Sequence, residues 1–460
     1  MKVARTDAIL AIGITVCATV LVGVLQARVP SQGQYILLLA PVVLLTVIAL
    51  IKYPEISFAL FLNAGAFKAD PRLDLPGLLD WTVILFVLAA VGALLRILDR
   101  EKELGRLPTG MILPLLFIAA SALLSLSYTL SPVYGQEKLL RFLSLTSFAL
   151  VAPWLILRSS RAIERFFITH LLASVSVAVN MLVSSTSRHD LSVFGTGNYL
   201  RVGTMSAQAI IILTLYLMHF PSKAVFRRIA VLGLIGLLLA ALGFSAARSA
   251  FVFLALTLLG ILITTYRRGG RWRPFVWLGL LAGRSAVVLL AIVLAIPLFF
   301  VLFRGDFRAM AGRLSLLPES GMLGRARQYL FAQALAAILD FPAILIGVGI
   351  GGFDGFIGGA SNAIRGLYPH NIVLEIGAEL GLPSLMAFVL LCRNAAKNLS
   401  VLYRQRIGEL LITDVLMFLL VFTFGDHLLH GDLNDARFLF ALLGITFSYC
   451  AQCMSHRGDR

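Results

Sequence analysis

The residue with the clearest chemical potential is His370, in the stretch Tyr368–Asn371 directly before an apolar run. Pro369 fits the start of a helix, so we expect His370 at a helix N-terminus. An imidazole titrates near neutral pH, and the positive end of a helix dipole favours its neutral form, which is the form a base needs. The position suits a general base, and it also suits a residue that only caps or packs the helix.

Cations at the ends of apolar runs form a second group of candidates. Arg248 lies in a very short turn, Phe244–Ser249, between two such runs, and Arg201 starts another. Lys138 and Arg141 follow the Ser131-Pro132 turn at the start of a further run. A cation near lipid is costly unless it is paired or functional, or snorkels to lipid headgroups. As a set, these side chains suit an anionic ligand such as a phosphate.

Two further patterns are weaker. The series Gly347-x-Gly349-x-Gly351 lacks the Lys and Ser/Thr of a phosphate loop, so a turn is the better interpretation. Asp426-His427-x-x-His430-Gly431-Asp432 has imidazoles and carboxylates at helical spacing. That spacing can place metal ligands on one face of a helix. We favour the alternative that Asp432 or Asp435 orients an arginine or a sugar hydroxyl, and we expect no metal.

The composition excludes a soluble protein. Of 460 residues, 59% are hydrophobic and only 13% charged, and the mean hydropathy is +0.92. Soluble domains are about 45–50% apolar and about 25% charged. The four cysteines, Cys17, Cys392, Cys450 and Cys453, form no metal-binding or redox framework, so we expect inert thiols.

Apolar runs predict thirteen or fourteen membrane helices. The predicted spans are 7–26, 35–51, 55–67, 79–98, 108–128, 137–157, 163–184, 203–219, 228–244, 249–266, 283–303, 372–392, 410–424 and 435–453. The net charge is +16, and alternate loops carry most of the Lys and Arg. This alternation requires 55–67 to cross, and it then places both termini in the cytoplasm. The basic charge is therefore a topology signal, and we expect no nucleic-acid partner.

One long loop, from Arg304 to Pro369, falls on the outer face and is rich in arginine. Within it, 323–339 has the pattern of an amphipathic helix, which suits either the membrane interface or packing on the bundle. We therefore divide the chain into an N-terminal transmembrane bundle (1–303), an outer, periplasmic loop (304–371) and C-terminal transmembrane helices (372–460). No cleavable signal peptide is evident.

The stretch from about 240 to 435 resembles the O-antigen ligase and O-antigen polymerase superfamily of bacterial membrane glycosyltransferases. The likeness rests on five motifs: Gly324–Tyr329 with its two arginines, Asp340-Phe341-Pro342, the Gly347–Gly351 turn, Tyr368–Asn371, and Glu375 followed by Glu379–Pro383. The Ser245–Ser249 turn and Gly431-Asp432-Leu433 are also similar to family patterns. Ser384 departs from them, because a second glycine is common there.

The resemblance implies a GT-C-like all-helical bundle in the bacterial inner membrane with a periplasmic active site. Its donor is a glycan on polyprenyl diphosphate, and its acceptor is a saccharide or lipid-linked hydroxyl. His370 is then the base and Arg248 a catalytic cation. Arg201, Arg325, Arg327, Lys138, Arg141, Asn371 and Asp432 then bind the diphosphate or the substrates. Arginines take the place of a metal, so no cofactor is expected.

Several alternatives stay open. Within the superfamily, the chain is either a polymerase or a ligase in O-antigen, capsule or exopolysaccharide synthesis. A second class is a transporter or flippase of lipid-linked sugars, for which Asp414 and Arg284 are candidate intramembrane charges; no internal repeat supports it. A third is peptidoglycan-type polymerisation, which relies on an outer-loop carboxylate such as Asp306 or Asp354.

Overall fold

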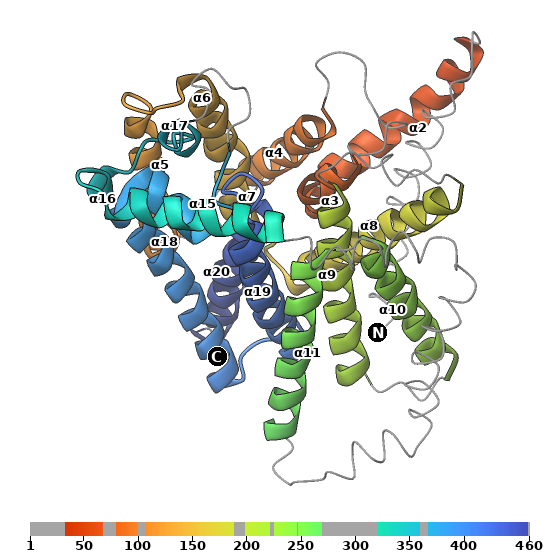
Figure 1. Cartoon of the computed structure of the whole chain (residues 1–460). Coiled ribbons are helices and arrows are strands. Elements are labelled where there is room, and N and C mark those ends of the chain that lie inside the picture. The colour runs from red at the N-terminus through yellow and green to blue at the C-terminus, as the bar shows by residue number, and fades with distance from the viewer. Residues whose placement is uncertain are drawn as a thin grey trace. The chain divides into compact units, whose positions relative to one another are not determined.

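The computed structural model describes residues 33–67, 80–99, 107–187, 198–220, 225–245, 247–268, 321–358 and 367–458 (Figure 1). These residues form helices and connecting turns, without strands in the described ranges. Nine of the described helices are long and apolar enough to cross a membrane, or ten if one bent pair counts as a span. The expectation of an all-helical, polytopic membrane protein is confirmed in this coarse form. The predicted spans 7–26 and 283–303, and the loop residues 304–320, lie outside the described residues.

The chain divides into two compact units, which we describe separately. The first contains residues 1–62, 79–169 and 321–460, and the second contains 63–78 and 170–320. The boundaries fall inside two helices, α3 (Pro54–Phe67) and α8 (Ser160–Ser187). This division differs from the predicted boundaries at 303 and 371, because segments far apart in sequence pack together.

The helices of the first unit, in chain order, are α2 (Gly33–Lys52), the start of α3, α4 (Trp81–Asp99), α5 (Thr109–Ser125), α6 (Pro132–Arg141), η3 (Phe142–Thr146), α7 (Ser147–Ile156), the start of α8, α15 (Gly321–Leu339), α16 (Ala343–Ile346), α17 (Phe353–Phe356), α18 (Ile372–Gln405), α19 (Leu410–His430) and α20 (Arg437–Gly458). α6, η3 and α7 form one continuous apolar span, in which η3 is a π-helical stretch. α15 packs along α18, and α7 packs on α20 (Figure 1).

Aromatic rings hold α3, α4 and α7 together in the first unit. Phe148 makes edge-to-face contacts with Phe58, Phe61 and Phe86, with centroid distances of 5.0–6.0 Å. Such pairs contribute about 0.5–1.5 kcal/mol each beyond the area they bury. By contrast, Leu94, Leu113 and Phe117 are exposed, as expected of side chains that face lipid.

The predicted span 55–67 forms part of a bent pair of helices. α2 and α3 bend by 104° at Tyr53, so the pair has the form of a broken span or a re-entrant loop. α3 has 14 residues and rises about 21 Å, which is less than the ~30 Å hydrocarbon core. The separate crossing that the alternation of basic loops requires therefore stays a prediction.

The buried Glu55 explains why α3 lies where it does. Its carboxylate accepts from Arg96 Nη2 at 2.8 Å and from Arg165 Nε at 2.6 Å. Arg96 also donates to the carbonyl of Ile156 at the end of α7, and Gln452 on α20 donates to Leu157 O. We call this region the Glu55 end of the first unit. It gathers Arg96 and Arg165 around one carboxylate.

The second unit contains α9 (Asn198–His219), α10 (Val225–Ser245) and α11 (Arg248–Arg268), with the remainders of α3 and α8. α9 packs on both α10 and α11. The approach is closest at Gly203, where an added Cβ would lie 2.4 Å from Ala247 Cβ. Inside this unit, the fully buried His170 contacts Asn63, with 3.1 Å between Nδ1 and Nδ2.

Candidate active site

His370 is held in place by the residue that follows it. Asn371 caps α18: its Oδ1 accepts from the backbone N–H groups of Val373 and Leu374, at 2.9 and 3.1 Å. Its Nδ2 donates to Leu428 O on α19 at 2.9 Å. His370 itself has φ 56°, an uncommon left-handed conformation for a residue other than glycine. The sequence predicts that Asn371 binds substrate, and its amide is instead used to fix the start of α18.

The surroundings of His370 keep its imidazole neutral. Its ring is half-buried and lies against Tyr368, with 4.2 Å between the ring centroids. Burial, and then the nearby Arg327 and His430, lower the pKa of His370 to about 4. A pKa lowered in this way favours the base form of the imidazole at neutral pH, and its main cause is burial rather than the helix dipole.

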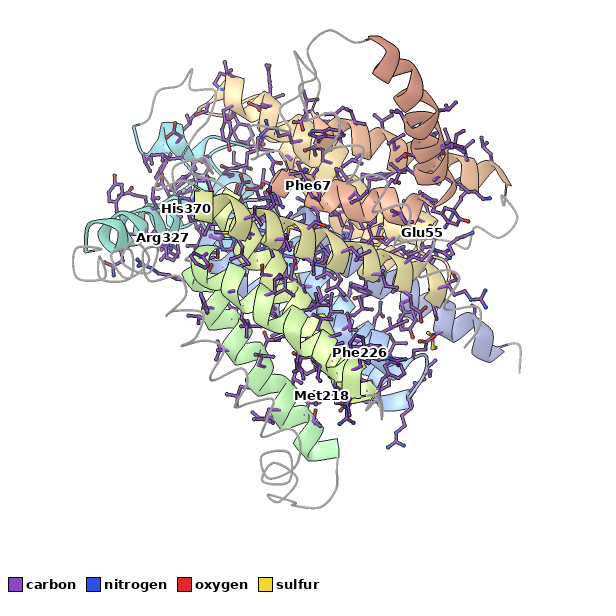
Figure 2. The ribbon with its side chains drawn as sticks, turned by 90° about the vertical axis from the view of Figure 1, so that its right-hand side faces the viewer. Glu55, Phe67, Met218, Phe226, Arg327 and His370 are labelled. Carbon is purple, nitrogen blue, oxygen red and sulfur yellow. The ribbon has the colours of Figure 1, made fainter. Side chains whose placement is uncertain are left out.

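Arg327 belongs to α15, whose other face is buried. Leu330, Ala334 and Ala337 pack into an apolar cluster with Ala343, Val348, Phe353 and Ala378. This packing leaves Arg327 exposed, in the same region as His370 (Figure 2). The side chain of Arg325 lies outside the described residues. Of the two arginines that the sequence could not separate, Arg327 is the one described beside His370.

Lys138 has a different environment from the one predicted. It is fully buried, and its Nζ lies between two carboxylates of α18, Glu375 and Glu379. Nζ donates to Oε1 and Oε2 of Glu379 at 2.8 and 2.7 Å. A buried ammonium enclosed in this way has no face left for a diphosphate. We therefore correct its role to one of joining α6 to α18. Arg141 is exposed and pairs with Glu137 one turn away on α6.

The Gly347–Gly351 turn packs against the break in α18. α18 is broken at Gly381, which has φ 79°, and Pro383 has no N–H to donate. The carbonyls of Ala378 and Glu379 instead accept from Val348 N at 2.9 Å and Gly349 N at 3.0 Å. Gly351 N donates to Glu379 Oε2 at 2.9 Å. The turn is thus buried, and its N–H groups at Val348, Gly349 and Gly351 donate to α18. Those N–H groups do not face a ligand, unlike the ones in a phosphate-binding loop.

Asp432 is also buried, in the turn between α19 and α20. Its Oδ1 accepts from Asn434 N, while Glu375 Oε2 accepts from Leu433 N, both at 2.9 Å. Burial is the main cause that raises the pKa of Asp432. The sequence predicts a substrate contact for Asp432; the geometry instead ties its turn to the acidic residues around Lys138. We call the region that contains His370, Lys138 and Asp432 the His370 end of the first unit.

The C-terminal end of α19 contributes three further ionisable side chains, Asp426, His427 and His430. His430 Nδ1 lies 3.2 Å from Oδ1 of Asp426, which is fully buried. His427 Nδ1 donates to Thr423 O at 2.9 Å, and its ring centroid lies 5.8 Å from that of His430. Among the described residues, no three His, Cys, Asp or Glu side chains are placed to hold a metal ion.

Arg201 and Arg248 are in the second unit and share one end of it. Arg248 is exposed at the first position of α11, and Arg201 is half-buried in the first turn of α9. Neither first turn contains an acidic residue. The close packing of Gly203 against Ser245 and Ala247 brings these two helix N-termini together. Two arginines and two positive helix ends favour an anion at this place.

Sequence reasoning missed the partners of Lys138. The signal is present, because a cation and two carboxylates spaced i and i+4 stand inside apolar runs and must be paired when buried. The family resemblance assigns Glu375 and Glu379 only to a motif. In comparisons with known proteins, no family model and no curated protein matches this chain.

Proposed function

We propose that this chain is a membrane glycosyltransferase that moves a glycan from polyprenyl diphosphate to an acceptor sugar hydroxyl. The observation that carries the proposal is His370, fixed at a helix start, half-buried, neutral, and beside the exposed Arg327. A base and a cation at the end of membrane helices match the needs of a lipid-linked donor: a proton to remove and a negative charge to stabilise.

The chemistry is one direct displacement. His370 takes the proton of the acceptor hydroxyl while that oxygen bonds to the anomeric carbon. The bond from this carbon to the phosphate oxygen breaks, and its electron pair leaves with polyprenyl diphosphate. The anomeric centre is inverted. Arg327 stabilises the charge that develops on the diphosphate. Within the second unit, Arg201 and Arg248 stay the predicted diphosphate ligands. These cations supply the stabilisation without a metal.

The proposed setting is the bacterial inner membrane, with both termini in the cytoplasm and the His370 end in the periplasm. The partners are the lipid-linked donor, a saccharide or lipid-linked acceptor, and membrane lipid. The product is O-antigen, capsule or exopolysaccharide. Polymerase and ligase share this chemistry and differ only in the acceptor, a second lipid-linked repeat unit or the lipid A core.

Transport of a lipid-linked sugar is the second candidate, and the buried Lys138 cluster favours it. Ionisable groups inside membrane helices often mark proton or ion paths. Here, however, Glu375 and Glu379 lie in the first two turns of α18 and accept from the backbone N–H groups of Leu433 and Gly351. Groups occupied in this way favour a structural role, so transfer remains the better proposal.

The test is complementation of a strain that lacks its own copy, with wild type, His370→Ala, Arg248→Ala and Arg327→Ala. Arg404→Ala, an exposed arginine in the last turn of α18, is the matched control. Membrane levels are checked by blot, and surface polysaccharide is separated on a gel. We expect His370→Ala, Arg248→Ala and Arg327→Ala to be present in the membrane but to give no polysaccharide product. Loss of chain extension alone identifies a polymerase, and loss of all attached glycan identifies a ligase. Wild-type product from His370→Ala would refute the assignment of the base.

A further inference from the structure

The two helices α15 and α16 are apolar on their outer side as well as where they pack. Five large apolar side chains on the outer side are 45–77% exposed: Leu335, Leu339, Phe341, Leu345 and Ile346. We call these five side chains the α15–α16 apolar surface. A helix that packs on one side and faces water on the other carries polar residues on its outer side. This surface therefore faces something other than water.

The same stretch contains little charge. From Gln328 to Ile346 the sequence has one charged residue, Asp340, which is exposed in the turn between the two helices. Arg327 and Tyr329 are exposed in α15. Arginine and tyrosine are side chains that reach lipid headgroups from an apolar segment. The pattern is that of a segment in the interface of a membrane, with apolar side chains toward the acyl chains.

α15 and α16 cover the first part of α18 (Figure 1). Across Ile372–Gly381, which the structure describes in full, α18 has no exposed side chain. The contacts are close, because a Cβ at Gly377 would lie 2.9 Å from Ile338 Cδ1. A Cβ at Gly381 would lie 2.5 Å from Leu345 O. α16 is therefore fixed at the level of Gly381.

Immediately after the covered part, α18 has the surface of a helix in lipid. Its exposed side chains in the next nine residues are all apolar: Leu382, Met386, Val389 and Leu390. Because α16 contacts Gly381, the α15–α16 apolar surface lies directly beside the start of this lipid-facing side. The two apolar surfaces adjoin each other.

The backbone after α16 also suits a position at the membrane. Lipid offers no partner for an N–H or a carbonyl group, so non-helical backbone there must bond within the protein. The N–H groups of Val348, Gly349 and Gly351 donate to α18. The carbonyls of Ile346 and Ile350 accept from the hydroxyl groups of two residues that follow α5, Tyr128 and Thr129.

We propose that the α15–α16 apolar surface contacts the hydrocarbon of the bilayer, with α15 lying in the membrane interface at the His370 end. One face of α15 packs on α18 and the opposite face meets acyl chains. The segment 323–339 then fills both of the roles that the sequence leaves open. Arg327 lies at the level of the lipid phosphates, and Asp340 faces headgroups and water. The partner is a lipid surface, whether the chain transfers a glycan or transports one.

The experiment uses the full-length protein in liposomes, after the four natural cysteines are replaced. Leu339→Cys and Leu345→Cys are each labelled with the fluorophore bimane. Its fluorescence is measured in liposomes of lipids brominated on the acyl chains and, separately, with iodide on both sides of an ordinary bilayer. We expect brominated lipid to quench the fluorescence at both positions and iodide to leave it nearly unchanged.

Met386→Cys and Arg404→Cys are the matched controls, because both positions are exposed on α18. Met386 lies in the lipid-facing part and Arg404 in the last turn of the helix. We expect brominated lipid to quench Leu339→Cys and Leu345→Cys to the same extent as Met386→Cys, and iodide to quench only Arg404→Cys. Melting temperatures equal to that of the cysteine-free protein show that each labelled variant keeps the fold.

Two outcomes overturn the proposal. Quenching of Leu339→Cys and Leu345→Cys by iodide, without an effect of brominated lipid, shows that the surface faces water. Protection from both quenchers shows that protein covers it, as in a complex with a second copy of the chain. The liposomes contain no glycan donor, so this result is independent of whether the proposed glycosyl transfer succeeds or fails.

Discussion

At the scale of single residues, His370 combines a left-handed backbone, an imidazole whose pKa is lowered, and a neighbouring arginine. The left-handed backbone costs about 1–3 kcal/mol, and it is tolerated because the next residue, Asn371, bonds both to the start of α18 and to Leu428 O on α19. His370 does not cap α18, because the N-cap residue is Asn371. The capping role that the sequence leaves open for His370 therefore belongs to its neighbour.

The low pKa of His370 predicts how stability changes with pH. In the unfolded chain, His370 binds a proton below its reference pKa of about 6.5, while in the folded protein it binds one only below about 4. Between these values the unfolded state holds more protons, so stability rises with pH over this window. We expect His370→Gln to remove this part of the pH dependence. The measurement is the melting temperature in detergent from pH 4 to 8; parallel curves for the two proteins would contradict the assignment.

Lys138 gives the largest stability prediction. Lys138→Met leaves Glu375 and Glu379 buried without their cation, and breaking a buried ion pair from one side costs about 3–5 kcal/mol. The triple change Lys138→Met, Glu375→Gln, Glu379→Gln removes all three charges and should recover much of this loss. Thermal unfolding in detergent measures the stability of the single and of the triple variant. Equal stability of the single variant and wild type would show that the cluster is not closed around the ammonium.

At the scale of elements, the break in α18 and the Gly347–Gly351 turn are bonded to each other and depend on each other. The kink at Gly381 frees carbonyls that the turn then satisfies, and both fix Glu379 beside Lys138. The sequence indicates a turn and a proline in the helix. It does not indicate that they bond to each other, because that pairing joins segments about thirty residues apart and depends on tertiary packing.

The glycine turn can be tested by adding a single methyl group. A Cβ at Gly347 would lie 2.1 Å from Glu379 O, and the residue has φ 75°. We expect Gly347→Ala to lower the melting temperature strongly and to reduce activity, because Glu379 and the start of α18 must shift. The matched control is Gly236→Ala in α10, where a Cβ meets nothing within 4 Å and alanine is favoured by up to about 1 kcal/mol. Equal melting temperatures for the two variants would contradict a closely packed turn.

The bend between α2 and α3 shows a limit of reading spans from apolar runs. The run 55–67 is apolar enough to be a span, yet it contains Glu55, which binds Arg96 and Arg165. An ion-paired carboxylate at the helix start is a tertiary feature that hydropathy does not register. Nine of the other predicted spans coincide with candidate membrane helices, including the continuous 137–157, although its π-helical stretch was not predicted. The predicted span 108–128 is the 17-residue helix α5, which is shorter than these candidates.

At the scale of the whole molecule, the first unit has two chemically distinct ends joined by α7, α18 and α20. One is built around Glu55 and its arginines, and the other around His370, Lys138 and Asp432. Loop charge predicts that Arg96 and Arg165 lie on one side of the membrane and His370 on the other, and this topology stays a prediction. Which charges pair within each end is seen in the structure and was not predicted from the sequence.

The topology prediction can be checked by labelling single cysteines after the four natural ones are replaced. Ser127→Cys is exposed beside Tyr128, which bonds Ile346 O at the His370 end, whereas Arg404→Cys is exposed in the last turn of α18. In spheroplasts, we expect an impermeant maleimide to label Ser127→Cys directly and Arg404→Cys only after permeabilisation. The reverse order would place the His370 end in the cytoplasm and exclude a periplasmic active site.

The most direct test of the central claim is to follow both products in one reconstituted reaction. Purified protein in liposomes receives a lipid-linked glycan donor, labelled separately in the glycan and the lipid, and an acceptor. We predict that free polyprenyl diphosphate and extended acceptor appear in equal amounts, and that His370→Gln suppresses both. Movement of intact donor across the bilayer, without release of polyprenyl diphosphate, would contradict glycosyl transfer and identify a transporter.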